Sequence, residues 1–180
     1  AGAKRRDPAP RPGRGSGGRV DGGSRVEGAP AASLHTGLAR MDGPADKVGA
    51  VHGDHQRELA EVQATYRELR ADLEPHLMKE EQVLFPMIRQ LVEASELPEF
   101  HCGSLQNPIS VMMTEHDRVG ELLVTLRART NGYRTPDDGC ASYRAFYDGL
   151  ADLEADTHLH VHKENNLLFL TFSLAEITPA

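Results

Sequence analysis

Two ten-residue stretches of the sequence repeat one pattern of potential metal ligands. The first is HLMKEEQVLF, from His76 to Phe85, and the second is HVHKENNLLF, from His160 to Phe169. If both are helical, the four-residue step from histidine to glutamate puts the two side chains on one face, about 6 Å apart. An imidazole nitrogen and a carboxylate oxygen presented together form half of a site for a transition metal. One such pair often occurs by chance, so it is the second copy that indicates two helices directing equivalent pairs at one centre.

Four segments with apolar residues at helical spacing are expected to carry these ligands, at about 31–51, 54–94, 107–131 and 138–170. The first is expected to break or kink at Gly43-Pro44, and Pro86 is expected to kink or end the first straight part of the second. Asn107-Pro108 supplies an N-cap and an N1 proline for the third. No segment alternates convincingly with period two. The expected fold class is therefore all-α, an antiparallel up-down-up-down four-helix bundle.

The ligand pairs lie within the apolar stripes of these helices, where an unpaired charge is costly. The second helix has inward columns at heptad spacing, Leu59, Tyr66, Leu73, Glu80, Met87 and Val62, Leu69, His76, Val83. The fourth has Tyr143, Leu150, Thr157, Glu164 and Phe146, Leu153, His160, Leu167. The third has Ile109, Met112, Met113, His116, Leu123 and Leu126. His158 and His162 fall off the stripe and are expected to be exposed.

Three helices thus each place a histidine on the buried face, and two of them add a glutamate. A single buried histidine is more often a hydrogen-bonded core residue, but five ligand-type residues at matched positions favour a metal site. No thiolate lies on the stripes, which disfavours structural zinc and iron–sulfur clusters. The H-E-x-x-H spacing of zinc peptidases and the E-x-x-H spacing of ferritin-like carboxylate proteins are absent as well. The set is suited to two irons bridged by Glu80 and Glu164, a centre that can change redox state and bind O₂ or NO.

The pattern on a four-helix bundle resembles the hemerythrin family. The stretches HLMKEEQVLFPMI, NPISVMMTEHDRVGELL and HVHKENNLLF are similar to the Repair of Iron Centers group, di-iron proteins that restore iron–sulfur clusters after nitrosative or oxidative damage. The resemblance covers roughly residues 34–174. It implies an Fe–O–Fe centre bound by His76, Glu80, His116, His160 and Glu164, with damaged iron–sulfur proteins as partners. A carrier or sensor of O₂ or NO without turnover is the alternative, and a bundle with a decayed site is a third interpretation.

The resemblance also implies one more histidine from the first helix, about 21 residues before His52, where this sequence has Ala31. The internal repeat gives nearly the same position. His116 precedes His160 by 44 residues, and the residue 44 before His76 is Ala32. The nearest histidine is His35, one turn later, and it is the tentative sixth ligand. An open position on one iron is the alternative. Beside His116, Glu115 and Asp117 are candidates to hydrogen-bond the ligands.

Composition limits the remaining possibilities. The chain has 180 residues, a formal charge of −7 and a pI near 5.7, which argue against nucleic acid as the main partner. No apolar run is long enough to cross a membrane, and two cysteines are too few for a disulfide framework. A cytoplasmic monomer or homodimer is expected. Residues 1–30 hold eight of the 17 glycines and seven Lys or Arg, so they are expected to form a disordered extension before a di-iron domain at 31–175.

Overall fold

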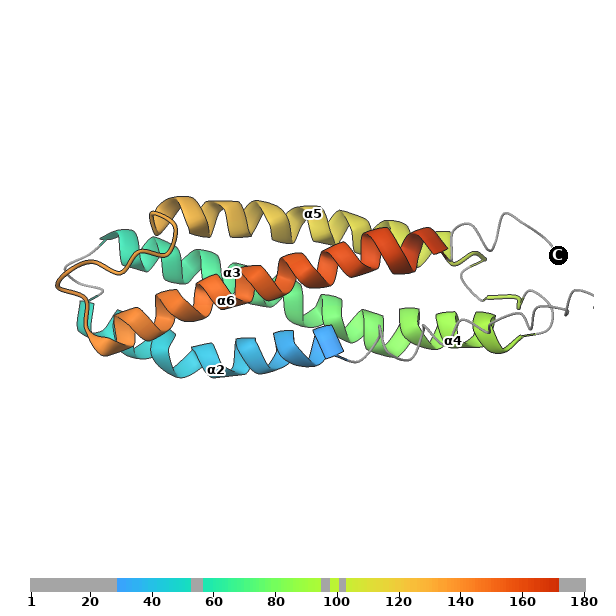
Figure 1. The fold of residues 1–180 in the computed structure, drawn as a ribbon, viewed down its shortest axis with the longest axis horizontal. Helices are drawn as coiled ribbons and strands as arrows, with labels where there is room; N and C mark the ends of the chain where they lie inside the picture. Colours follow the sequence, from blue (N-terminus) through green and yellow to red (C-terminus); the bar gives the residue numbers. More distant parts are fainter. Residues whose placement is uncertain (1–28, 53–56, 95–97, 101–102, 172–180) are drawn as a thin grey trace, which may run out of the picture.

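The computed structural model describes residues 29–52, 57–94, 98–100 and 103–171. Figure 1 shows their course and labels the α-helices. The symbol η denotes a π-helical segment. The elements are α2 (Ala29–His52), α3 (Arg57–Lys79), η1 (Glu80–Leu84), α4 (Phe85–Glu93), α5 (Gln106–Arg129), α6 (Ala141–Lys163) and η2 (Glu164–Phe169). The predicted extension 1–30 lies outside the described residues except for its last two, which begin α2.

The helices form an antiparallel bundle in which the chain reverses direction at each connection (Figure 1). α2 packs against α3 and α6, and α5 packs against the same two helices. Because α3, η1 and α4 form one continuous rod, α4 extends beyond the start of α2. The predicted all-α, up-down-up-down four-helix bundle is thus confirmed. Within the described ranges the only β feature is an isolated bridge between Phe100 and Gly103, and none of the described helices is long and apolar enough to span a bilayer.

Two apolar clusters fill the bundle, one on each side of the histidines and glutamates. The larger lies toward α2 and includes Leu34, Leu69, Leu77, Phe146 and Leu153. The smaller lies under η1, α4 and η2 and includes Leu84, Phe85, Ile109, Met112 and Phe169. Burying such a side chain contributes about 1.5–3 kcal/mol. The two clusters therefore hold the helices together. They also shield from water the layer of buried histidines and glutamates between them, which is called the polar layer below.

Each rod that carries a ligand pair changes from α- to π-helix at its glutamate. η1 begins at Glu80 and η2 at Glu164, which are equivalent positions in the two sequence repeats. A π-helical turn holds one residue more than an α-helical turn, so the inward positions after it move on by one. Two of the four predicted columns are therefore wrong at their last members, because Val83 is 40% and Leu167 54% exposed while Leu84 and Leu168 are buried. The last members of the other two columns, Met87 and Glu164, are buried as predicted.

Three further expectations need correction. α2 runs without a break through Gly43-Pro44, because buried Met41 and Ala45 hold both sides of the proline against the rest of the bundle. Met113 is 47% exposed although Met112 is buried, since neighbouring residues of an α-helix point about 100° apart. Pro86 does not end the rod either. It lies in the first turn of α4, where proline is tolerated.

Candidate metal centre

Five side chains predicted from the sequence to be ligands meet in the polar layer of the bundle. They are His76, Glu80, His116, His160 and Glu164. One ligand atom from each lies within 4.8 Å of all the others, and all five residues are buried. They come from α3 and η1, from α5, and from α6 and η2. Three rods of the bundle thus converge on one point, as the repeated sequence pattern predicts.

Each glutamate contacts imidazoles from two different rods. Glu80 Oε1 lies 2.7 Å from His76 Nε2 and 3.3 Å from His160 Nε2. Glu164 Oε2 lies 3.3 Å from His116 Nε2 and 3.4 Å from His160 Nε2. His76 Nε2 and His116 Nε2 are 3.1 Å apart. All three histidines therefore direct the same ring nitrogen, Nε2, toward the shared centre, and each carboxylate joins two of them.

Two carboxylate oxygens at this centre lack hydrogen-bond partners among the described residues. They are Glu80 Oε2 and Glu164 Oε2, both buried; Glu164 Oε2 lies within ion-pair distance of His116 and His160 but forms no hydrogen bond with either. Leaving a buried polar atom without a partner costs about 1–3 kcal/mol, and more when it is charged. Coordination to a cation would remove that cost. Three imidazole nitrogens with two carboxylates form a donor set that suits iron among the transition metals, so the residues fit a di-iron centre.

The pKa values at the centre show that it attracts positive charge. Burial disfavours the charged form of His76 and His116, but attraction to the nearby carboxylates outweighs burial and raises both pKa values, that of His116 to about 9. Burial also disfavours ionised Glu80, yet attraction to the three nearby imidazoles outweighs it and holds the pKa of Glu80 well below its usual range. Burial and the nearby charge of Glu80 raise the pKa of Glu164.

The outward nitrogens of two histidines have their own partners. His76 Nδ1 lies 2.9 Å from Glu115 Oε2, and Lys79 forms an ion pair with the same carboxylate. His116 Nδ1 lies 3.0 Å from Asn165 Oδ1. This contact supports the expected role of Glu115 as a hydrogen-bond partner of a ligand, whereas Asp117 is exposed. The sequence reasoning missed Lys79 and Asn165, although each directly precedes or follows a ligand glutamate.

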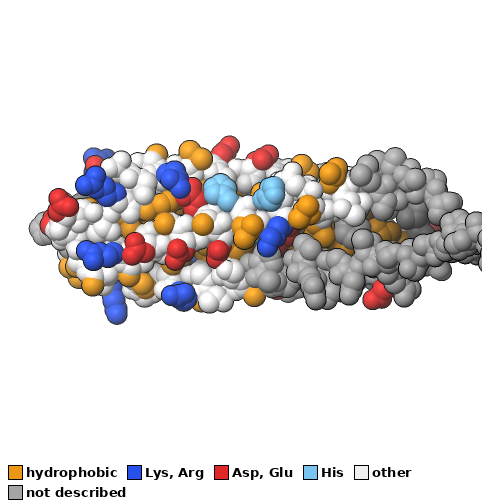
Figure 2. All heavy atoms as spheres, viewed as in Figure 1, with side chains coloured by type: hydrophobic (Ala, Val, Ile, Leu, Met, Phe, Trp, Pro, Cys, Tyr) orange, Lys and Arg blue, Asp and Glu red, His pale blue; other side chains and the backbone are white. Residues whose placement is uncertain are grey.

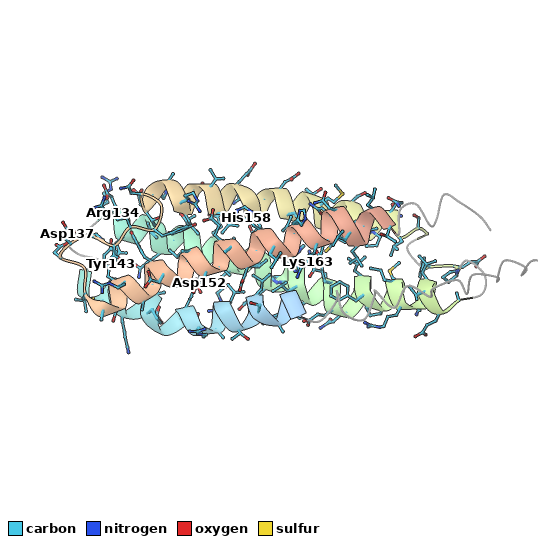
Figure 3. The ribbon with its side chains drawn as sticks, viewed as in Figure 1. Arg134, Asp137, Tyr143, Asp152, His158 and Lys163 are labelled. Atoms are coloured by element: carbon cyan, nitrogen blue, oxygen red, sulfur yellow. The ribbon has the colours of Figure 1, made fainter. Side chains whose placement is uncertain are left out.

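His35, the tentative sixth ligand, is not brought into the five-residue group. Its Nε2 lies 3.3 Å from Glu81 Oε1, and its side chain is 39% exposed. To act as a ligand, its ring would have to leave Glu81. His158 and His162 are exposed, as expected. Figure 2 shows histidine side chains on the surface over α6, and Figure 3 labels His158 there.

Comparison with known proteins decides the family. The model of the hemerythrin HHE cation binding domain matches residues 34–171. The chain belongs to the hemerythrin family. Hemerythrin domains bind a pair of non-haem iron ions, and the five-residue cluster fits such a pair. The matched range begins at Leu34, so it includes His35 and leaves out Ala31.

This hemerythrin domain is also similar to curated repair proteins. It is 38% identical over 125 residues to a probable iron-sulfur cluster repair protein of Haemophilus influenzae, a match covering 69% of this chain and 52% of the relative. It is equally similar to the iron-sulfur cluster repair protein YtfE of Escherichia coli O81, of which 53% is covered. The predicted resemblance to the Repair of Iron Centers group is thereby confirmed. The chain spans about half the length of the curated relatives it matches.

Proposed function

We propose that this chain uses a di-iron centre to restore iron–sulfur clusters damaged by nitrosative or oxidative stress. The observation that carries the proposal is the buried five-residue cluster, in a chain similar to proteins named for iron–sulfur cluster repair. Its partners would be damaged iron–sulfur proteins, with O₂ or NO as small ligands. A cytoplasmic setting is consistent with only two cysteines in 180 residues.

The proposed ligands of the two irons are the five clustered residues, with Glu80 and Glu164 as bridges. The bridging role is supported by the contacts of each glutamate with imidazoles from two rods. When bound, the irons would supply a change of redox state and a coordination position for a small ligand. The surrounding leucines and phenylalanines keep the polar layer dry, which strengthens every electrostatic interaction within it.

Lys79 and Glu115 hold His76 in a defined state. The Glu115 carboxylate accepts the Nδ1–H of His76, so Nε2, which faces Glu80, is the nitrogen that would bind iron. The ammonium of Lys79 compensates the charge of Glu115, and together with the hydrogen bond from His76 it outweighs partial burial to lower the pKa of Glu115. The carboxylate thus stays ionised near neutral pH and keeps the imidazole oriented.

Repair can be tested with a [4Fe–4S] enzyme inactivated by NO. The enzyme is incubated without air with the iron-loaded chain, with the Glu80→Ala chain, or with the same amount of free iron(II), and its activity is followed. We expect recovery at least about tenfold faster with the iron-loaded chain than with either control, because iron held by the chain would be oriented toward the damaged cluster once the two proteins have met. Recovery no faster than with free iron(II), together with reversible binding of NO, would instead support a carrier or sensor.

A further inference from the structure

His116 is held on several sides by the π-helical segment η2. Glu164 Oε2 lies 3.3 Å from its Nε2, and Asn165 Oδ1 lies 3.0 Å from its Nδ1. The ring of Phe169 stacks on the imidazole, with 5.9 Å between centroids and 6° between planes. η2 thus provides the proposed ligand on one side of His116, a hydrogen-bond acceptor on the other, and an apolar face.

The π-helical geometry is what allows residues 164 and 169 to contact the same ring. In an α-helix, residues five apart point about 140° away from each other. The i→i+5 hydrogen bonds of a π-helix bring them nearly above one another. Figure 3 labels Lys163, the last residue of α6, and η2 starts directly after it. The change of helix type at Glu164 therefore places three residues of one segment around His116.

Asn165 determines which nitrogen of His116 is free to bind a metal. In a neutral imidazole one ring nitrogen donates a hydrogen bond and the other has a lone pair. The amide oxygen of Asn165 can only accept, so the proton belongs on Nδ1. When a metal is bound, the lone pair would then be on Nε2, the atom that faces Glu164 and His76. The opposite tautomer would put a proton where the metal must bind.

We propose that Asn165 is a positioning residue that fixes the orientation and tautomer of His116 at the di-iron centre. The inference rests on the proposed iron site, and it does not depend on repair activity. It also predicts that the two histidines differ as ligands. His76 is backed by a carboxylate and His116 by a neutral amide, and a carboxylate partner makes an imidazole the stronger electron donor. His116 would thus be the weaker electron donor of the two histidines.

The neighbouring Asn166 offers a matched control. Its side chain is exposed, and its amide nitrogen contacts only His162 among the described residues, at 3.2 Å from Nδ1 and 3.1 Å from the carbonyl oxygen. An Asn166→Leu chain carries the same chemical change as Asn165→Leu one residue away. The two variants alter the composition of η2 equally, but only one of them removes the acceptor for His116.

The test measures iron(II) affinity by competition with a chelator, without air, and records Mössbauer spectra of the loaded chains. We expect Asn165→Leu to bind iron about 10- to 100-fold more weakly, while Asn166→Leu matches the unmodified chain. Asn165→Asp keeps an acceptor oxygen, so it should retain affinity and change the signal of one iron, which a merely structural role would not do.

Two results would overturn the proposal. The first is an Asn165→Leu affinity within twofold of that of Asn166→Leu. The second is an Asn165→Asp chain whose two iron signals are unchanged. Failure of the unmodified chain to bind iron is a different outcome, since it would reject the di-iron site itself. The comparison therefore separates the role of Asn165 from the proposed function.

Discussion

Replacing either proposed bridge, Glu80→Ala or Glu164→Ala, is expected to eliminate the coupled di-iron centre. Loss of a hydrogen-bonded partner of a metal ligand costs about 10- to 100-fold in affinity, so loss of a direct ligand shared by two irons should cost more than about 100-fold. Each carboxylate contacts imidazoles from two rods. Its removal should therefore abolish the link between the two irons, and not only weaken the binding of one of them. Iron content and magnetic exchange coupling measure the effect.

Glu81 provides the control for this experiment. It follows Glu80 directly but is exposed, and its carboxylate contacts His35 outside the cluster. Glu81→Ala should leave iron content and exchange coupling unchanged. Circular dichroism of the metal-free chains shows whether helicity is retained. An exchange-coupled pair of irons in either Glu80→Ala or Glu164→Ala would contradict the bridging role.

The second large effect concerns position 31, near the start of α2. Ala31→His is expected to raise iron affinity by about tenfold or more, since a direct ligand contributes at least as much as the partners that orient ligands. His35→Ala should leave iron affinity unchanged, because His35 contacts Glu81 instead of the five-residue group. Both variants are compared with the unmodified chain in one chelator titration under anaerobic conditions.

The reverse pattern would assign the sixth ligand to His35. A loss of iron affinity in His35→Ala, with no gain in Ala31→His, requires the imidazole of His35 to leave Glu81 and reach the metal. A metal bond tolerates errors of only about 0.2 Å, so α2 would then have to shift along the bundle when iron binds. The pair of variants therefore distinguishes an open coordination position from a helix that moves.

The fold and the five clustered residues could be predicted because they depend on periodicity alone. A residue on the apolar face at heptad spacing faces the core whatever its chemistry, which is why His76 and Glu80 were found among leucines. The same reasoning failed at Val83 and Leu167. A periodicity of 3.6 cannot represent a turn that holds one extra residue. The π-helical turn accounts for the burial of both Glu80 and Phe85, which are five residues apart.

The partners of the ligands could not be predicted in the same way. Contacts such as Glu115 with His76, or Asn165 with His116, join residues on different rods. They depend on how far each rod is rotated and shifted against its neighbour, which a one-dimensional pattern does not contain. His35 illustrates the same limit, because a position one turn from the expected ligand lies about 6 Å away along the helix.

Metal analysis of the full chain, reconstituted without air, tests the central claim most directly. The five-residue cluster predicts about two iron ions per chain, exchange-coupled and bound by nitrogen and oxygen ligands. The measurement combines iron content with Mössbauer and X-ray absorption spectra of the same sample. Less than about half an equivalent of iron, with zinc bound tightly in its place, would contradict the account.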